Sequence, residues 1–368
     1  MADTAAVVEQ AQPDGDAAGV PGLARGRKLA LFLLGSVLLA AGIAIAMLWW
    51  AHVRHLELVP TLRAVGWAAI AAALGLHLAS QLVWALRLWV VGRGTGSGIS
   101  FGFAFRLVTA GVFGAAVTPG RAGGEGLRYY LLRRRHPDPD HAMRFLVADR
   151  TLDLAFFLLA GIPAAIVLPT LLGGDFVYRA FALAGVGLVA VALVLLLLLV
   201  ADVAWVRAAL RPLAGLAARL MPSLGPRLLV SLDLGLRHTR EGLALLLRER
   251  RLHLAVAALL TLGTWVLEFM VLWVLLRAFG FPVGLLAVFL GAVVLNLVTA
   301  AAATPGSAGV AELAALAIYQ GMAPGLSPIF VVLWRLVTYG YDLGVGGLVA
   351  VGEGVLTLGR RKPAQRTV

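Results

Sequence analysis

The fold is decided by residues 118–135, which read TPGRAGGEGLRYYLLRRR and lie among apolar tracts of membrane length. One proline and several glycines interrupt regular helix here, and Arg121, Glu125 and Arg128 bring charge into the same few residues. Irregular, charged backbone survives at membrane depth only where protein buries it or water reaches it. The stretch therefore predicts the tip of a re-entrant hairpin that lines a cavity. The alternative is a cytoplasmic loop before an amphipathic helix.

A second copy of the motif favours the hairpin. Residues 304–309 read TPGSAG and match TPGRAG at residues 118–123. Each copy also has an acid close behind it, Glu125 in the first and Glu312 in the second, one residue out of step. The repeated sequence indicates two hairpins of related design.

The spacing of a later arginine supports an internal duplication. Arg150 lies 31 residues after Pro119, and Arg335 lies 30 residues after Pro305. Two landmarks at nearly one spacing are more typical of a duplicated unit than of chance, although the residues between them hardly match.

Composition places the chain in the membrane. Of its 368 residues, 61% are hydrophobic and 14% are charged, whereas a soluble domain carries roughly 25% charged residues. The absence of cysteine excludes disulfides and thiolate chemistry. The formal charge of +12 fits cytoplasmic loops facing anionic inner-leaflet lipid better than it fits nucleic acid, which we do not expect as a partner.

The apolar tracts predict a single membrane domain over residues 29–358. It is flanked by a disordered cytoplasmic tail at residues 1–28 and a basic cytoplasmic tail at residues 359–368. The first tract is 22 residues long, which favours a retained anchor over a cleaved signal peptide. The predicted segments lie at about 29–50, 64–91, 142–168, 180–204, 252–279 and 328–358, and a basic amphipathic segment at 206–251 is expected on the inner leaflet.

Basic residues set the expected orientation. Of the 31 lysines and arginines, 22 fall in regions assigned to the inside and three in regions assigned to the outside, so both termini should be cytoplasmic. The unit at about 64–168 then runs opposite to the unit at about 252–358. We expect an all-α polytopic protein with about six to eight transmembrane helices and two re-entrant broken-helix hairpins in an inverted repeat, an arrangement typical of transporters.

Charged residues inside the predicted segments are candidate site residues. Arg87 either snorkels to the head-group region or faces the cavity. Asp149 and Asp153 share a helix face, and Arg150 beside them can neutralise much of the cost of two buried acids.

Two further polar residues lie within spans. Glu268 is expected either to line the cavity or to pair with an arginine, with the paired structural role slightly favoured, because a lone carboxylate in a membrane is costly. His77 is expected to make a hydrogen bond from one helix to another.

Taken together, these motifs resemble the lysylphosphatidylglycerol synthase transmembrane-region family. The residues that carry the resemblance are TPGRAGGE with Arg128, then Asp149, Arg150 and Asp153, and later TPG with Glu312 and Arg335. The resemblance covers about residues 29–358 and implies a flippase-like domain. Full synthases of that family have a further soluble transferase domain, for which this chain leaves no room, so the transferase activity is not expected. Asp342 stands where the family often has proline.

The function expected from the resemblance is movement of a lipid or lipid-linked head group between leaflets of a prokaryotic plasma membrane. The lipid is a phospholipid or a polyisoprenoid-linked lipid, and no cofactor or metal is expected. The alternatives are an enzyme that modifies lipid head groups and a non-transporting scaffold. Candidate substrate-binding residues are Arg87, Arg121, Glu125, Arg128, Asp149, Arg150, Asp153, Glu312 and Arg335. Candidate hinge residues are Pro119, Gly120, Gly123, Pro305, Gly306 and Gly309.

Overall fold

The described part of the chain is built of helices and contains no β-strand. The structure, a computed structural model, describes residues 58–118, 120–135, 139–171, 251–302 and 304–359, with single positions at 49 and 187. Its helices are α2 (Leu58–Val65), α3 (Trp67–Thr95), α4 (Phe101–Val117), α5 (Ala122–Arg135), α6 (Pro139–Leu171), α10 (Arg251–Ala278), α11 (Leu285–Ala300), α12 (Val310–Met322), α13 (Ile329–Arg335), the π-helix η1 (Leu336–Gly340) and α14 (Tyr341–Gly359).

Four helical stretches of the described part are long and apolar enough to cross a membrane. They are Trp67–Thr95, His141–Thr170, Arg251–Ala278 and Ile329–Gly354, the last of which combines α13, η1 and part of α14. At ~1.5 Å per residue each exceeds the roughly 30 Å of a hydrocarbon core. Large apolar side chains on them are exposed, such as Leu159 at 77% and Leu259 at 67%, which suits contact with lipid.

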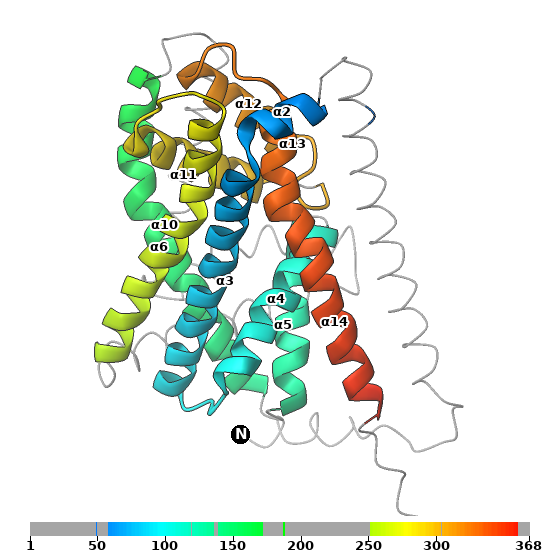
Figure 1. Cartoon of the computed structure of the whole chain (residues 1–368). Helices are drawn as coiled ribbons and strands as arrows, with labels where there is room; N and C mark the ends of the chain where they lie inside the picture. Colours follow the sequence, from blue (N-terminus) through cyan, green and yellow to red (C-terminus); the bar gives the residue numbers. More distant parts are fainter. Residues whose placement is uncertain are drawn as a thin grey trace, which may run out of the picture.

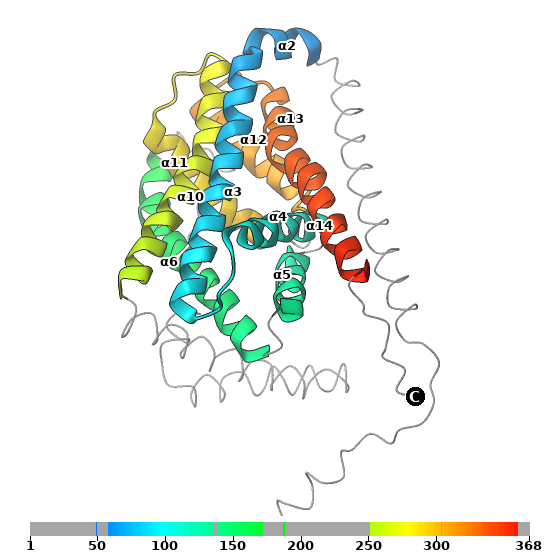
Figure 2. The same ribbon diagram turned by 60° about the horizontal axis from the view of Figure 1, so that its bottom comes forward.

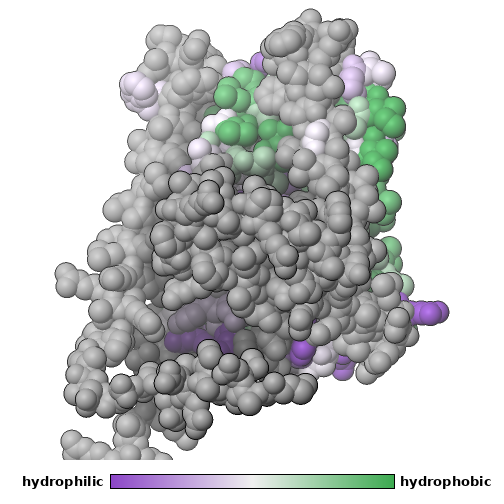
Figure 3. Space-filling model, turned by 180° about the vertical axis from the view of Figure 1, so that it is seen from behind, coloured by the Kyte–Doolittle hydropathy of each residue, from purple (hydrophilic) through white to green (hydrophobic). Residues whose placement is uncertain are grey.

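The long helices run between two ends of the molecule (Figure 1). We call the end where α3 and α5 finish the lower end, and the end where α10 finishes the upper end. α3 descends, α6 ascends, α10 ascends, and α13 to α14 descend (Figure 1). Hydrophilic side chains gather at the lower end of the visible described surface, whereas apolar ones dominate above (Figure 3).

Short helices fill the space between the long ones. α4, α11 and α12 have 17, 16 and 13 residues, so at ~1.5 Å per residue they are shorter than the hydrocarbon core. α4 and α5 lie in the lower half, α11 and α12 lie in the upper half (Figure 1), and α4 lies between α3 and α14 (Figure 2). These lengths suit re-entrant hairpins; the number of spans and the internal duplication stay predictions.

Glycines allow the hairpin helices to approach their neighbours closely. A Cβ added at Gly346 of α14 would lie 2.7 Å from the carbonyl oxygen of Thr109 in α4, and one at Gly114 of α4 would lie 2.6 Å from the carbonyl oxygen of Gly123 in α5. Close backbone approach through small residues is a common way to pack helices in membranes. It fixes the first hairpin against α14.

Two apolar cores hold the helices together. One is formed mainly by α10 to α13, with Phe269, Val293 and Phe330 buried in it. The other is formed mainly by α3 to α6, with Leu107 and Phe145 buried in it. The polar site described below takes residues from helices of both cores.

The described helices match the expected segments closely. The tracts predicted at 64–91, 142–168, 252–279 and 328–358 correspond to α3, α6, α10 and the α13 to α14 stretch. The predicted segments at 29–50, 180–204 and 206–251 and both tails lie outside the described residues, apart from the isolated positions 49 and 187, Arg251 at the start of α10 and Gly359 at the end of α14.

Candidate functional site

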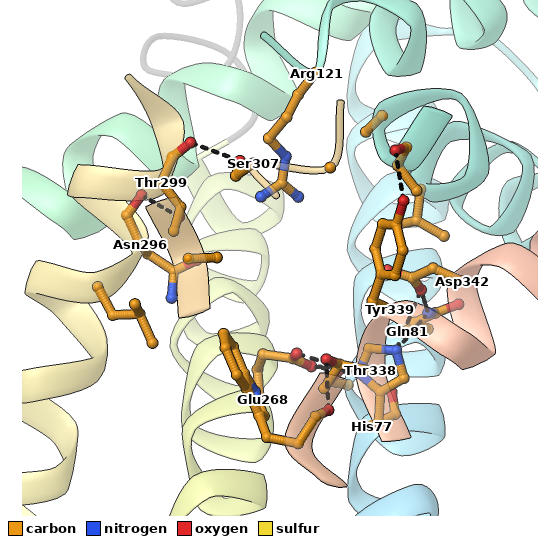
Figure 4. Close-up of a pocket in the computed structure, with 18 of the residues that line it drawn as sticks. His77, Gln81, Arg121, Glu268, Asn296, Thr299, Ser307, Thr338, Tyr339 and Asp342 are labelled. Carbon is orange, nitrogen blue, oxygen red and sulfur yellow. Dashed lines mark hydrogen bonds and ion pairs between the residues drawn. The ribbon is translucent and has the colours of Figure 1, made fainter. Parts of the chain in front are cut away.

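A cavity of about 140 Å³, lined by both charged and apolar side chains, lies between the two hairpins. Its walls come from α3, α6, α10, α13, η1 and α14, together with the ends of α4 and α11 and the turns that follow them. Charged and polar side chains that line it include His77, Arg121, Glu268, Asn296, Tyr339 and Asp342 (Figure 4). We call it the central cavity.

The two hairpin tips have the same backbone geometry. Gly120 and Arg121 have φ of 60° and 59°, and Gly306 and Ser307 have φ of 56° and 58°. Arg121 N–H donates to the Thr118 carbonyl at 3.3 Å, closing the first turn. In the second turn the corresponding donor is Ser307, at 3.0 Å from its acceptor. Positive φ costs a non-glycine residue energy and is found preferentially at functional sites.

Arg121 and Ser307 use this shared geometry differently. The Ser307 hydroxyl is buried and donates to the carbonyl of Thr299 at 2.8 Å. The Arg121 side chain instead extends into the central cavity, between Ser307 and Tyr339 (Figure 4). It is exposed and makes no hydrogen bond or ion pair with any residue that the structure describes. Among the described residues, this guanidinium has no partner at hydrogen-bond or ion-pair distance.

The two tips also touch each other. A Cβ added at Gly306 would lie 2.9 Å from the Ala116 carbonyl of α4. The hydroxyl of Tyr339 in η1 donates to the same carbonyl at 3.2 Å. Arg335 holds the second tip from behind, because its Nη2 donates to the Gly306 carbonyl at 2.8 Å and its Nε donates to Glu312 at 2.6 Å. The two hairpins therefore meet at the central cavity.

A second polar feature, the ionic cluster, lies beside the cavity. It consists of Arg87, Glu125, Arg128, Asp149, Arg150 and Asp153 from α3, α5 and α6. With all six groups ionised, three cations face three anions.

Arg87 lies at the centre of the ionic cluster and is fully buried. Its Nη1 is 2.5 Å and its Nη2 is 3.1 Å from the two oxygens of Asp153. Its Nη2 also lies at ion-pair distance, 2.8 Å, from Asp149, though without hydrogen-bond geometry. Thr261 of α10 accepts a further bond at 3.2 Å. Both sequence interpretations of Arg87, snorkelling and cavity lining, are therefore wrong, because two carboxylates hold it inside the protein.

The other cations of the cluster surround Trp84. Arg128 lies 4.2 Å and Arg150 5.1 Å from the centroid of its ring, distances at which cation and ring attract each other. Arg150 pairs with Glu125 at 2.6 Å and with Asp153 at 2.9 Å. Arg150 is partly exposed, whereas Arg128 is buried. Among the described residues of the cluster, Arg150 and Glu125 are the most exposed, so their side is the one within reach of an incoming ligand.

Glycine makes room for the buried cation of α5. A Cβ added at Gly111 of α4 would lie 3.0 Å from Cγ of Arg128. Arg128 Nη1 lies 3.3 Å from Glu125 and 3.8 Å from Asp149. Glycine at this position lets the long side chain run between the helices.

A third feature, the histidine network, forms one wall of the central cavity. Nδ1 of His77 lies 2.9 Å from Glu268 of α10, and Nε2 lies 3.2 Å from Asp342 of α14. Ser80 donates to Glu268 at 2.7 Å and Gln81 donates to Asp342 at 2.8 Å (Figure 4). The expected helix-to-helix hydrogen bond of His77 is confirmed, whereas Glu268 lines the cavity and pairs with His77 instead of with an arginine.

Sequence reasoning missed this network as a unit. Its partners are far apart in the chain, but His77, Gln81, Trp84 and Arg87 follow one another at helical spacing on α3. That polar stripe was the available signal. The π-helix before Asp342 gave no comparable signal, although π-helical turns are frequent at functional sites.

The structure sorts the predicted site residues into three groups. Six of them form the ionic cluster, Glu312 and Arg335 form a pair behind the second tip, and Arg121 stands alone in the cavity. Of the predicted hinge residues, Gly120, Gly306 and Gly309 have positive φ, Gly123 lies within α5, and Pro119 lies outside the described residues. The described residues hold no cluster of three or more His, Asp or Glu side chains arranged for a metal ion.

Comparison with known proteins identifies the family. The family described as the lysylphosphatidylglycerol synthase TM region matches residues 36–346. The chain belongs to that family. A UPF0104 membrane protein of Archaeoglobus fulgidus is 25% identical to it over 288 residues, which cover 78% of this chain and 87% of the relative. Membership of the lysylphosphatidylglycerol synthase TM family, together with the four long apolar helices, makes this a multi-pass membrane protein. Both hairpin motifs lie inside the matched range.

Proposed function

We propose that this protein moves a lipid with an anionic phosphate head group between the two leaflets of a membrane. The observation that carries the proposal is the guanidinium of Arg121 in the central cavity, which pairs with none of the described residues and lies at the meeting point of two hairpin tips. A charge without a close partner is energetically costly within a membrane protein, so such a residue is a candidate for a functional role. Binding an anion is the simplest task for it.

The chemistry of the cavity selects phosphate. Guanidinium groups bind phosphate through charge-assisted, bidentate hydrogen bonds. The amide of Asn296 also lines the cavity, and one of its two hydrogens is available as a neutral donor because the other is bonded to the Ala292 carbonyl. The family name connects its members with a phospholipid, lysylphosphatidylglycerol. A phospholipid or a polyisoprenoid phosphate would present the same group to Arg121.

A groove beside the ionic cluster offers a place for the lipid tail. It lies between α5 and α6, has a volume of about 530 Å³, and is lined by apolar side chains such as Leu146, Val147 and Leu154. Glu125 and Arg150 line the same groove. A tail could remain in this groove, in contact with the bilayer, while the head group approaches the polar centre. The charged residues of the cluster are proposed as its approach route.

The charge distribution supports an orientation for this protein. Basic residues lie at the lower ends of the helices, with Arg93 at the end of α3, three arginines at the end of α5 and Arg251 at the start of α10. The upper end has Arg63 of α2 and Arg277 of α10. By the excess of basic residues on the inner side, the lower end faces the cytoplasm and anionic inner-leaflet lipid. Both termini are then cytoplasmic, in a prokaryotic plasma membrane.

Lipid exchange in vesicles of purified protein tests the proposal. Arg121→Gln should slow the exchange of labelled phosphatidylglycerol at least about tenfold, because a hydrogen bond to a charged group contributes roughly 1.5–3 kcal/mol. Arg277→Gln is the matched control, because Arg277 is also exposed and stands outside the cavity, beside Trp273.

The control should exchange lipid at the native rate. Equal rates for the native protein and Arg121→Gln would refute the role of Arg121. No exchange by the native protein of phosphatidylglycerol, phosphatidylethanolamine or a polyprenyl phosphate would refute the function itself.

A further inference from the structure

The histidine network joins three helices at the wall of the central cavity. His77 comes from α3, Glu268 from α10 and Asp342 from α14. The side chain of His77 is only 5% exposed, whereas those of Glu268 and Asp342 are 24% and 19% exposed. The imidazole lines the cavity but is more shielded than its two carboxylate partners.

The two neighbours of Nε2 require opposite protonation states of this nitrogen. Nε2 lies 3.2 Å from the Asp342 carboxylate, which requires a proton on the nitrogen. It also lies 3.1 Å from the amide nitrogen of Gln81, which requires a lone pair there instead. The amide orientation is set by Asp342, because Gln81 must present its NH₂ to that carboxylate at 2.8 Å. One nitrogen thus has a hydrogen-bond partner in either protonation state.

Both states keep the two carboxylates and the imidazole hydrogen-bonded. In the neutral state Nδ1–H donates to Glu268, and Nε2 accepts from Gln81. In the protonated state Nδ1–H still donates to Glu268, and Nε2–H donates to Asp342. Gln81 keeps its bond to Asp342 throughout, since its amide carries two hydrogens. A purely structural histidine would need only one of these arrangements.

We infer that His77 is the proton-binding group of the transport cycle, taking up one proton with each anionic lipid head group and releasing it with that head group. This inference rests on the proposed function. The other titratable and charged groups that line the same cavity are Arg121, Asp153, Glu268, Arg335, Tyr339 and Asp342, and Tyr341 of α14 meets the imidazole edge-on at 5.1 Å.

Electrostatics gives the sign of the coupling. With His77 neutral, the positive charge of Arg121 faces the negative charges of Glu268 and Asp342 in one cavity. A phosphate bound to Arg121 adds another negative charge, which favours the imidazolium form of His77. By linkage, protonation of His77 favours phosphate binding to the same extent. Proton and lipid then move together, and a singly charged lipid crosses without net charge.

The decisive experiment uses the native protein in phosphatidylcholine vesicles that contain fluorescent phosphatidylglycerol. A difference of one pH unit is imposed across the membrane, and potassium with valinomycin holds the membrane potential at zero. One proton per lipid should enrich the labelled lipid about tenfold in the leaflet on the alkaline side, because one pH unit is a tenfold difference in proton activity. Protein-free vesicles give the background. Changing the potential should leave the ratio unaltered.

Variants then assign the proton to the network. His77→Gln and Asp342→Asn should both abolish the asymmetry, and each is first checked for native folding by thermal unfolding in detergent. Glu353→Gln is the matched control and should keep the asymmetry, because Glu353 is a carboxylate on α14 that pairs with Arg106 outside the cavity.

The outcomes separate the inference from the proposed function. Exchange without a gradient, combined with no asymmetry under a gradient, overturns the inference and leaves the proposed function standing. No exchange under either condition overturns both. Asymmetry that survives in a folded His77→Gln variant overturns the assignment to His77.

Discussion

Replacing Arg121 by glycine should make the protein more stable and less active. Arg121 has φ of 59°, and its side chain has no hydrogen-bond partner among the described residues. Left-handed backbone costs a non-glycine residue about 1–2 kcal/mol, and the added freedom of glycine in the unfolded chain costs roughly 0.4–1 kcal/mol. The difference leaves a gain of about 0.8 kcal/mol in the free energy of unfolding.

Ser307 provides the matched comparison, because it has the same backbone conformation, with φ of 58°. Its hydroxyl donates to Thr299 at 2.8 Å, and losing such a bond costs about 1 kcal/mol. Ser307→Gly should therefore be near neutral, with the loss of the hydrogen bond offsetting the relief of strain. Arg121→Gly should be the more stable variant by about 1 kcal/mol.

Equilibrium unfolding with increasing SDS measures both stabilities, and lipid exchange in vesicles measures activity. Arg121→Gly should combine higher stability with at least about tenfold slower exchange, since its backbone is relaxed and only the guanidinium is lost. A variant that is less stable than the native protein would refute the argument from strain. A variant with native exchange would show that the strained arginine serves no transport function.

Two further changes test the packing around the site. Asp153→Asn should lower the free energy of unfolding by about 3 kcal/mol, because it leaves the buried guanidinium of Arg87 without its bidentate partner; a loss below about 1 kcal/mol in the same SDS titration would contradict this. Gly346→Ala should cost about 1–3 kcal/mol, because its Cβ would lie 2.7 Å from the Thr109 carbonyl. A Cβ added at Gly352 on the same helix would have no atom within 4 Å, so Gly352→Ala should raise the free energy of unfolding by up to about 1 kcal/mol. Equal effects of the two alanine substitutions would refute close packing of α14 on α4.

The helical segments could be predicted because they depend on local composition. Apolar runs of membrane length exclude other structures, since only helices and closed barrels satisfy every backbone hydrogen bond in lipid. The repeated TPG motif likewise marks two breaks in helix, because proline and glycine act on the chain locally. The sequence also placed His77 correctly in a hydrogen bond between helices.

The partners of the charged residues could not be predicted in the same way. Arg87 was assigned either to the lipid surface or to the cavity, yet it is buried against Asp149 and Asp153 of α6. Glu268 was expected either to line the cavity or, with a slight preference, to pair with an arginine; it lines the cavity and bonds to His77 on α3. Ion pairs and hydrogen bonds form between helices, and which side chains meet depends on how each helix is rotated about its axis and how deep it lies in the membrane. The hydrophobic periodicity of the sequence does not determine these two quantities.

By itself, the sequence determined the class of the protein, the places where its membrane helices run and break, and the set of charges that enter the membrane. Only the tertiary structure decided which of those charges are neutralised. It gave all six cluster residues and Arg335 partners of opposite charge, and it left Arg121 open to the cavity. The physical reason is that hydrophobicity and helix breaking are properties of a segment, whereas the pairing of two charges is a property of the distance between segments.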